Sequence, residues 1–408
     1  MDGSIQAAGQ ARGRDCFSPN EPTGVRWRAR FEVPGTMPTP IEVGRGLVKN
    51  LQPERILPPE SMGSAVFLFT DETVHELYGK GVLSRFKEHG LDAIELVLPV
   101  GEQSKSLASY SYLVERVLGH GLDEQSVFIS LGGGVVCNVC GFVASTIYRG
   151  MRLIHLPTTV MAQVDAAISH KQGINARWGK NLIGSYFPPS LVACDIDTLA
   201  TLPQDLVIDG LAEVLKHGLV QDGSYARYLL DYDGELQDPG FLETVVKRNI
   251  ALKCELEKID PKEKGPAYVL QYGHTVGHAV EHLSGYDLRH GEAIAIGMMV
   301  AAETAWRMGA CSMKVVEFHE SLLQKYKLPV TVPEYIRADD ILEALKYNKY
   351  YRTDGIRMAL PKTIGHLLSV GGQYSIPVNA SVIVSAIEAR KEGGSRCTTP
   401  LSLERVAV

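Results

Sequence analysis

The sequence predicts an α/β fold in two parts: an N-terminal nucleotide-binding domain built on a parallel sheet, and a mainly α-helical C-terminal domain. Three observations lead to this prediction. Short apolar runs alternate with helical patterns through roughly the first 200 residues, which is typical of a parallel sheet covered by helices. A glycine-rich turn directly follows one of these runs. From about Pro203 onward, helical spacing dominates and strand signals are few.

The first part of the chain is expected to begin with an alternating strand and to continue with buried ones. Val25–Val33 alternates polar and apolar residues, as a half-buried strand does. Later runs are short, apolar and rich in β-branched and aromatic residues, which favours buried strands at Ala65–Phe69, Ala93–Leu98, Ser126–Leu131 and Arg152–Leu156. Helices are predicted from Val74, after a polar turn, and over Leu107–Leu118.

The second part is expected to be a set of helices. Apolar residues recur at intervals of three and four, which predicts helices over Val207–Val220, Phe241–Lys258, Thr275–Leu283, Glu292–Met308 and Val315–Tyr326. The predicted boundaries are a disordered leader at 1–25, the α/β domain at 26–202, the helical domain at 203–390 and a loose tail at 391–408. Truncation of residues 1–25 is expected to leave activity unchanged.

Composition excludes several functional classes. Lys and Arg number 41 against 47 Asp and Glu, and this net charge of −6 offers no general attraction to nucleic acid or to anionic membranes. Seven scattered cysteines form no disulfide framework, which favours a reducing cytosol. The N-terminus lacks a long apolar core of a signal peptide, and no run reaches about 18 uninterrupted apolar residues. The predicted location is therefore cytoplasmic.

The glycine-rich turn at Gly132–Gly134 has two interpretations. Glycines let the backbone approach a pyrophosphate closely, and a following helix N-terminus favours its charge. A tight turn between a strand and a helix is the alternative, because the full G-x-G-x-x-G pattern is missing. The polar loop at Val100–Lys105, taken alone, is typical of a solvated turn.

Histidines are concentrated in one segment and predict a metal site. His274, His278 and His282 recur at intervals of four on one helical face, and His290 follows. Two histidines and a carboxylate suit Zn²⁺ or a similar ion, and Glu213 is a plausible third ligand from another helix. Structural histidines are the alternative. The Cys137–Cys140 pair is interpreted as core packing, with half of a metal or redox motif as the alternative.

Polar residues between the glycine turn and the helical part could bind an anion. The set comprises Arg149, Asp165, Lys171, Lys180 and Asn181, and a solvated surface is the alternative. Lys216 lies one turn from Glu213 on the same predicted helix face. Lys253, Glu263 and Lys349 carry no signal individually, since most such charges lie on solvated helices or loops.

Taken together, these segments resemble the sugar-phosphate cyclases, the family that contains 3-dehydroquinate synthase. The matching segments follow the family's order over roughly residues 60–300: GEQSKS (101–106), GGGVVCNVCGF (132–142), YRG (148–150), PTTVMAQVDAAISHKQGIN (157–175), GKNLIGSYFPP (179–189), DGLAEVLKHG (209–218), YGHTVGHAVEH (272–282) and HGEAIAIGM (290–298). The full ordered set is far more specific than any one motif.

The resemblance implies a dehydroquinate synthase-like fold with bound NAD, a divalent metal such as zinc or cobalt, and an active site between the two domains. The implied metal ligands are Glu213, His274 and His290. The implied NAD-binding residues are Asp71, Glu102, Lys105, Gly133, Gly134, Val135, Asn138, Thr158, Thr159 and Lys180. The residues implied to face a phosphorylated sugar are Arg149, Asp165, Lys171, Asn181, Lys216, Lys253, Glu263, His278 and Lys349. A homodimer is also implied, with Arg149 reaching a neighbouring subunit's site.

Departures from the dehydroquinate synthase pattern bear on the substrate. Ala267 stands where that pattern has an arginine that helps to hold the substrate carboxylate, and Gln271 where it has an asparagine. Alanine cannot supply a bidentate contact to a carboxylate. Asn138, Lys171-Gln172 and Asn348-Lys349 look most like 2-deoxy-scyllo-inosose synthase, whereas Gly355–Gly365 looks more like dehydroquinate synthase.

The expected reaction is therefore the cyclisation of glucose 6-phosphate to 2-deoxy-scyllo-inosose, a step of aminoglycoside antibiotic biosynthesis, with release of phosphate. The resemblance implies transient oxidation by NAD, β-elimination, re-reduction and an intramolecular aldol closure, with Glu263 or His278 as candidates for proton transfer. The alternatives are 3-dehydroquinate synthase, another heptulose-phosphate cyclase, or an NAD- and metal-dependent polyol dehydrogenase. A non-catalytic scaffold is disfavoured by the complete metal-ligand set.

Overall fold

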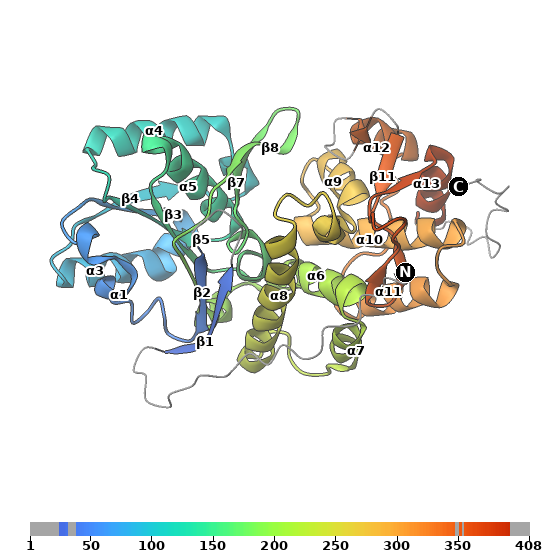
Figure 1. The fold of residues 1–408 in the computed structure, drawn as a ribbon, viewed down its shortest axis with the longest axis horizontal. Coiled ribbons are helices and arrows are strands. Elements are labelled where there is room, and N and C mark those ends of the chain that lie inside the picture. Colours follow the sequence, from blue (N-terminus) through green and yellow to red (C-terminus); the bar gives the residue numbers. More distant parts are fainter. Residues whose placement is uncertain (1–23, 32–37, 347–350, 353–354, 392–408) are drawn as a thin grey trace.

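The structure, a computed structural model, describes residues 24–31, 38–346, 351–352 and 355–391. The predicted leader and tail lie almost wholly outside this range. Figure 1 shows an α/β part and a helical part side by side, with helices α6 (Gln204–Gln221) and α8 (Pro239–Ile259) between them. The fold class predicted from the sequence is confirmed. Among the described residues, no helix combines the length and the apolar character needed to cross a bilayer.

A seven-stranded sheet forms the centre of the N-terminal part, in the order β1-β2-β9-β6-β5-β3-β4. Every neighbouring pair is parallel except β1 with β2. The strands are β1 (Val25–Phe31), β2 (Thr39–Gly44), β3 (Val66–Asp71), β4 (Ala93–Leu98), β5 (Val127–Gly132), β6 (Arg152–Pro157) and β9 (Leu191–Asp195). The five predicted strands are thus confirmed, whereas β2 and β9 were not predicted.

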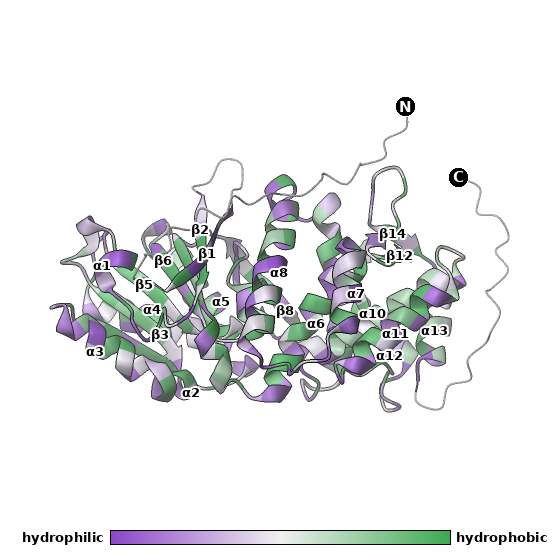
Figure 2. Cartoon of the chain, turned by 90° about the horizontal axis from the view of Figure 1, so that it is seen from below, coloured by the Kyte–Doolittle hydropathy of each residue, from purple (hydrophilic) through white to green (hydrophobic). Residues whose placement is uncertain are grey.

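Helices cover this sheet and complete the predicted α/β units. The main ones are α3 (Lys80–Glu88), α4 (Leu107–His120) and α5 (Gly134–Thr146). Figure 2 shows hydrophobic residues along the central strands, as expected for a parallel sheet buried on both faces. Phe67, Phe69 and Phe128 pack together under α4 and α5 in one of the two hydrophobic clusters of this part.

The order of the strands indicates where a sheet of this kind is expected to bind a ligand. From β3 the chain crosses outward to β4, and it then returns to the other side of β3 to form β5. In open parallel sheets, ligands bind at such a reversal, beyond the carboxyl ends of the strands. Here those ends are Asp71 on β3 and Gly132 on β5, so the glycine-rich turn lies at this reversal.

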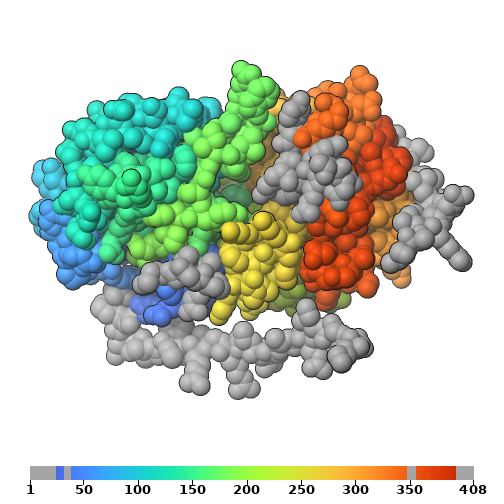
Figure 3. Space-filling model, turned by 45° about the horizontal axis from the view of Figure 1, so that its top comes forward, coloured from blue at the N-terminus to red at the C-terminus, as the bar shows by residue number. Residues whose placement is uncertain are grey.

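A two-stranded hairpin extends from the α/β part toward the helical part. It consists of β7 (Lys171–Ala176) and β8 (Gly179–Tyr186), which pair antiparallel. Figure 3 shows this hairpin in green, rising between the two parts of the molecule. The sequence analysis did not predict it. It carries three of the candidate site residues, Lys171, Lys180 and Asn181.

The helical part contains the five predicted helices, which correspond to α6, α8, α9 (His274–Leu283), α10 (His290–Arg307) and α11 (Met313–Lys325). Three further helices were not predicted: α7 (Gly223–Asp231), α12 (Ala338–Leu345) and α13 (Ala380–Ala389). Short strands also occur: β10 (Tyr351–Arg352), β11 (Gly355–Met358), β12 (Pro361–Thr363), β13 (His366–Leu367) and β14 (Ile376–Val378). Runs of two to four residues are too short to give a reliable alternating pattern.

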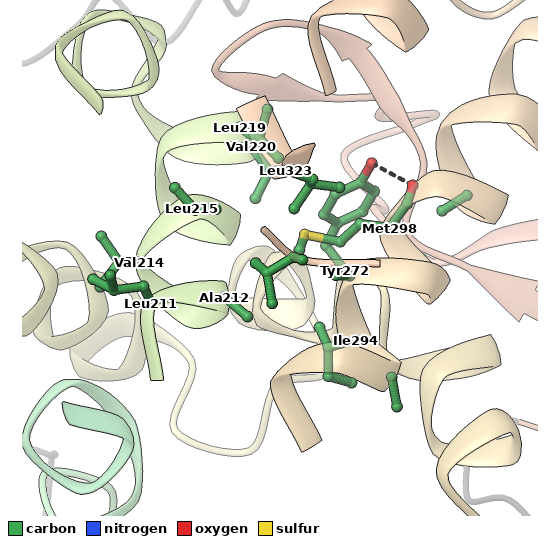
Figure 4. Packing of buried hydrophobic residues seen from close by; sticks show 14 of the residues in the cluster. Leu211, Ala212, Val214, Leu215, Leu219, Val220, Tyr272, Ile294, Met298 and Leu323 are labelled. Carbon is green, nitrogen blue, oxygen red and sulfur yellow. Dashed lines mark hydrogen bonds between the residues drawn. The ribbon is translucent and has the colours of Figure 1, made fainter. Parts of the chain in front are cut away.

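Helix α10 is the centre of the helical core. It is buried along almost its whole length and packs against α6, α9, α11 and α13. Figure 4 shows Ile294 and Met298 of α10 on the side of α6 where Ala212 lies. The buried Tyr272 hydroxyl donates a hydrogen bond to the Met298 carbonyl oxygen at 3.1 Å, which fixes the chain just before α9.

Glycines bring α9 unusually close to α10. A Cβ atom at Gly297 would lie 2.0 Å from the carbonyl oxygen of Gly273, and one at Gly277 would lie 2.9 Å from the carbonyl oxygen of Ala293. Gly273 also has φ = +79°, a backbone conformation that glycine adopts without strain. These glycines therefore set the distance between the histidines of α9 and His290 at the start of α10.

Candidate functional site

The residues predicted to bind a dinucleotide line the carboxyl edge of the sheet. Asp71 ends β3 and caps the following short helix, since the Val74 N–H donates to its Oδ1 at 2.9 Å. Burial raises the pKa of Asp71. Thr158 and Thr159 follow β6, and the Thr158 N–H donates to the Gly132 carbonyl oxygen at 3.0 Å. The carboxyl ends of the neighbouring parallel strands β3, β5 and β6 thus lie together at this edge of the sheet.

The first turn of α5 provides a suitable place for a pyrophosphate. Gly133 precedes the helix, and a Cβ there would lie only 3.1 Å from Cγ2 of Thr159. Gly134, Val135 and Asn138 follow on the first turns, which carry no acidic residue. The Thr158 hydroxyl is buried without a hydrogen-bond partner among the described residues. A buried hydroxyl without a partner, next to the N-terminus of a 13-residue helix, suits the binding of a phosphate group.

A second group of predicted cofactor residues connects the loop after β4 to the hairpin. Lys180 Nζ lies 3.1 Å from Glu102 Oε1, which also accepts a hydrogen bond from Asn175 Nδ2 at 2.7 Å. Burial disfavours the charge of Glu102, but Lys105 and Lys180 outweigh it and lower the pKa of Glu102. Lys105 donates to Asn181 Oδ1 at 2.6 Å, and its burial lowers its pKa to about 8. Asn181, predicted to face the substrate, therefore contacts a residue predicted to bind the cofactor.

The predicted metal ligands come together from three helices. Glu213 of α6 has Oε1 3.6 Å from Nε2 of His274 on α9 and 3.9 Å from Nε2 of His290 on α10. Donor atoms around a tetrahedral zinc ion lie about 3.3 Å apart, so small shifts would bring these three atoms to a metal. Glu213 Oε1 is buried and has no hydrogen-bond donor in the described part of the chain. A carboxylate oxygen without a hydrogen-bond donor, together with two imidazole nitrogens, is a suitable set of ligands for a divalent metal.

Hydrogen bonds orient both histidine rings for this role. Nδ1 of His274 lies 3.1 Å from the Tyr272 carbonyl oxygen, and Nδ1 of His290 lies 3.2 Å from Glu281 Oε2. Each Nδ1 is therefore the donor, so in the neutral form of each ring Nε2 is the nitrogen whose lone pair faces Glu213. Burial and the nearby Lys216 hold the pKa of His274 well below its ordinary value, so this ring is neutral, the form that binds metals.

His278 is a further member of the same cluster. Its ring centroid lies 5.0 Å from that of His274 and 5.8 Å from that of His290, and the three histidines offer nitrogen atoms within 4.8 Å of one another. Two three-ligand sets thus share His274 and His290, and they differ in whether Glu213 or His278 is the third ligand. His282 does not join the cluster; its ring lies beside Tyr286.

A cluster of paired charges lies next to the metal ligands and contains most of the predicted substrate residues. Lys253 of α8 binds Asp165, with Nζ 2.5 Å from Oδ1 and 3.0 Å from the backbone oxygen. Lys171 pairs with Glu263, which also accepts a hydrogen bond from Gln271. Lys216 pairs with Glu213 and donates to the Leu270 carbonyl oxygen at 2.8 Å.

Sequence reasoning missed two carboxylates of the site. Glu257 is buried 3.6 Å from Lys171 Nζ and 3.9 Å from Lys253 Nζ, and burial raises its pKa. Glu281 binds both Lys180 and His290. Both could have been found from spacing, because Glu257 is four residues from Lys253 and Glu281 is three from His278 on predicted helices.

Two predicted residues are not brought into the described cluster. Arg149 is exposed after α5, with φ = +64°, and makes no hydrogen bond or ion pair with any residue that the structure describes. Lys349 lies outside the described residues. Cys137 and Cys140 are free and buried, in agreement with the core-packing interpretation.

Comparison with known proteins gives consistent matches over both parts of the chain. Residues 95–209 match the family described as 3-dehydroquinate synthase N-terminal, and residues 210–350 match 3-dehydroquinate synthase C-terminal. The 3-dehydroquinate synthase of Symbiobacterium thermophilum is 37% identical over 334 residues, or 81% of this chain and 92% of that protein. The 2-deoxy-scyllo-inosose synthase of Streptomyces lividus is 36% identical over 334 residues, or 80% of this chain and 87% of that protein.

The fold of this chain is also similar to that of a solved structure. The crystal structure of 2-deoxy-scyllo-inosose synthase complexed with carbaglucose-6-phosphate, NAD⁺ and Co²⁺ matches with a TM-score of 0.78 at 27% identity. The match covers 88% of this chain and 99% of that one. The two relatives above are nearly equal in identity, so identity over the aligned residues does not separate their two activities.

Proposed function

The chain belongs to the 3-dehydroquinate synthase family of sugar-phosphate cyclases, and we propose that it converts glucose 6-phosphate to 2-deoxy-scyllo-inosose with release of phosphate. The product is a precursor for aminoglycoside antibiotics in this proposal. Because the family assignment is common to both activities, the choice of substrate depends on the residues of the site.

The observation that carries this choice is the segment that precedes the metal-ligand helix. Pro266–Gln271 contains no cationic side chain, and Ala267 within it is completely buried. Gln271 binds the Glu263 carboxylate. A carboxylated heptulosonate would need a cation to hold its carboxylate, preferably a bidentate arginine. Glucose 6-phosphate has no carboxylate, so this segment suits it.

The lysines of the charge cluster support a phosphorylated substrate. Lys171 has the most accessible side chain of the three described lysines there, 35% exposed, compared with 4% for Lys253 and 2% for Lys216. We propose that Lys171 releases Glu263 to bind the phosphate, together with Asn181, Arg149, His278 and Lys349. Glu263 is then placed to accept or return a proton, with His278 as the other candidate.

In this proposal NAD is held by the residues at the carboxyl edge of the sheet, and a divalent metal, zinc or cobalt, by Glu213, His274 and His290. When bound, NAD supplies a reversible hydride acceptor and the metal lowers the pKa of a substrate hydroxyl. Asp165, Lys216 and Lys253 hold the substrate beside these groups, which suits a reaction in which one flexible sugar must adopt several reactive geometries.

The protein is proposed to act in the cytoplasm as a homodimer, with Arg149 completing the site of the neighbouring subunit. This would account for its exposure and for its distance from any described ion-pair partner.

Phosphate release with simultaneous recording of NADH absorbance tests the reaction class. Purified protein with NAD⁺ and Co²⁺ is given glucose 6-phosphate, and inorganic phosphate is measured over many turnovers. The proposal expects phosphate to accumulate while NADH stays at or below one equivalent per site. NADH that rises in step with product, without phosphate, would instead identify a polyol dehydrogenase.

A further inference from the structure

We propose that Glu281 is a positioning residue that connects the cofactor side of the site to the metal side by binding Lys180 with one carboxylate oxygen and His290 with the other. The inference rests on the proposed function only in taking His290 as a metal ligand and Lys180 as a cofactor residue. Glu281 itself touches neither group.

The contacts of Glu281 come from two different parts of the molecule. Its Oε1 accepts a hydrogen bond from Lys180 Nζ at 2.6 Å, and Lys180 belongs to β8 of the hairpin. Its Oε2 lies 3.2 Å from Nδ1 of His290, the first residue of α10. The side chain is only 4% exposed, so water does not compete for these contacts.

The contact with His290 determines which nitrogen faces the metal ligands. A carboxylate only accepts hydrogen bonds, so Nδ1 of His290 carries a proton, and in the neutral ring, the form that binds a metal, Nε2 presents its lone pair. Nε2 is the atom that lies 3.9 Å from Glu213 Oε1. Carboxylates in this position beside a metal-binding histidine typically contribute 10- to 100-fold to metal affinity.

The contact with Lys180 connects Glu281 to the cofactor side of the site. Lys180 is shared between Glu281 and Glu102, and burial of the lysine is outweighed by these two carboxylates, which raise its pKa. Glu102 has no imidazole partner; its other described contact is with the Asn175 amide. Glu102 and Glu281 therefore bind the same ammonium group, but only Glu281 also binds a histidine.

A carboxylate is needed at position 281 because both contacts require an acceptor. Glutamine offers one amide oxygen, and its NH₂ group can only donate. Beside the charged Lys180, that oxygen turns toward the ammonium and leaves the NH₂ facing His290 Nδ1. The imidazole then shifts to the tautomer that carries its proton on Nε2, where a metal ligand needs a lone pair. Glu281→Gln should therefore damage the metal site from a distance.

Cobalt binding measures this effect without any sugar phosphate. Co²⁺ is titrated into apoprotein and followed by its visible d–d absorption, which reports the coordination as well as the affinity. Glu281→Gln is expected to weaken Co²⁺ binding about 10- to 100-fold. Glu102→Gln is the matched control, because it removes the other carboxylate from Lys180, and its Co²⁺ affinity is expected to stay within about threefold of the unmodified protein.

A double variant tests whether one side chain at position 281 serves both Lys180 and His290. Replacing Lys180 by Met removes the group that captures the glutamine oxygen, so this oxygen becomes available to His290. The Lys180→Met, Glu281→Gln protein is therefore expected to bind Co²⁺ at least roughly fivefold more tightly than Glu281→Gln alone. Glu281→Asp keeps the buried charge but is one methylene shorter, and it is expected to weaken Co²⁺ binding even if the glutamine variant does not fold.

The proposal is overturned if Glu281→Gln, or Glu281→Asp in its place, keeps its Co²⁺ affinity within twofold. It is also overturned if Glu102→Gln weakens Co²⁺ binding as much as Glu281→Gln does. A third contradicting result is a Lys180→Met, Glu281→Gln protein that binds Co²⁺ no more tightly than Glu281→Gln alone. These results are independent of the substrate. If the variants behave as expected but the protein does not release phosphate from glucose 6-phosphate, the role of Glu281 is supported and the proposed function is contradicted.

Discussion

Lys253 Nζ lies 2.5 Å from Oδ1 of Asp165 and 3.0 Å from its backbone oxygen, although the two residues are 88 positions apart. Lys253 belongs to α8 of the helical part, and Asp165 to a one-turn segment, Ala162–Ala166, that follows β6 of the sheet. The pair therefore ties the two parts of the molecule together near the sheet edge and the predicted metal ligands.

Loss of this ion pair is expected to destabilise the fold. Lys253 is 4% exposed and Asp165 is 32% exposed, so Lys253→Met should lower the free energy of unfolding by about 1–3 kcal/mol, less than for a fully buried pair. Urea unfolding followed by circular dichroism measures it. The control is Lys247→Met, which breaks a partly buried pair with Glu243 on the same helix, away from the junction of the two parts, and should cost about 0.5 kcal/mol. Equal losses for the two variants would contradict the account.

The metal site offers a choice between two ligand sets. If Glu213, His274 and His290 are the ligands, Glu213→Gln should reduce Co²⁺ affinity at least roughly 100-fold, whereas His278→Gln should reduce it less than about tenfold. The hydrogen bonds that turn Nε2 of His274 and His290 toward Glu213 are the physical reason. Isothermal titration of each apoprotein with Co²⁺ decides the matter. The opposite order of losses would assign the site to the three histidines.

Stability is expected to fall as the pH decreases below about 6.5. His155 and His319 are fully buried, and burial lowers the pKa of His155 to about 3 and that of His319 to about 4. In the unfolded chain these rings titrate near pH 6.5, so below that pH the unfolded state binds more protons and is favoured. Each histidine should cost roughly 2 kcal/mol at pH 5. His319→Gln should show a smaller decrease of melting temperature between pH 7 and pH 5 than the unmodified protein. An equal decrease would contradict the explanation by buried histidines.

The buried cysteines of α5 are expected to be unreactive in the folded protein. Burial raises the pKa of the Cys137 thiol to about 12 and raises that of Cys140 well above its ordinary value, so the reactive thiolate is scarce. A thiol reagent should label them only at the rate of unfolding, as shown by mass spectrometry of the peptide that carries both. Rapid labelling at pH 8, without loss of structure, would mean that this pair is accessible and would reopen the redox interpretation.

Subunit mixing tests the role proposed for Arg149. Arg149→Ala and Lys216→Ala should each be nearly inactive alone. If Arg149 completes the neighbouring site, a mixed dimer of the two variants restores one intact site, so an equimolar mixture recovers about a quarter of the normal activity. The mixture must be unfolded and refolded together so that subunits exchange. No recovery, with mixed dimers present by mass spectrometry, would place Arg149 within its own subunit's site.

Local patterns made much of this structure predictable. The apolar run of β5 and the glycines behind it predicted a strand that opens into a helix N-terminus, which is what the parallel sheet contains. The spacing of His274 and His278 predicted one helical face, and α9 presents both rings toward His290. These features depend on residues within one or two helical turns, where sequence spacing fixes geometry.

The partners of the site charges could not be predicted in the same way. Asp165 and Lys171 are close in sequence and were grouped for that reason, yet they bind Lys253 and Glu263, which are 88 and 92 positions away. Such pairs form only when the sheet edge meets α8. Glu257 and Glu281 resembled ordinary charges on the solvent face of a helix, because a sequence does not show that a helix is covered by a hairpin from another part of the chain.

The sugar that the enzyme accepts is the central claim, and one measurement tests it most directly. The kcat/KM for phosphate release is determined in parallel for glucose 6-phosphate and for the heptulosonate substrate of 3-dehydroquinate synthase, with NAD⁺ and Co²⁺ present. Since Ala267 supplies no cation for a carboxylate, kcat/KM is predicted to be at least roughly 100-fold higher for glucose 6-phosphate. Phosphate released only from the heptulosonate would contradict the account and would mean that another cation, such as Lys253, holds the carboxylate.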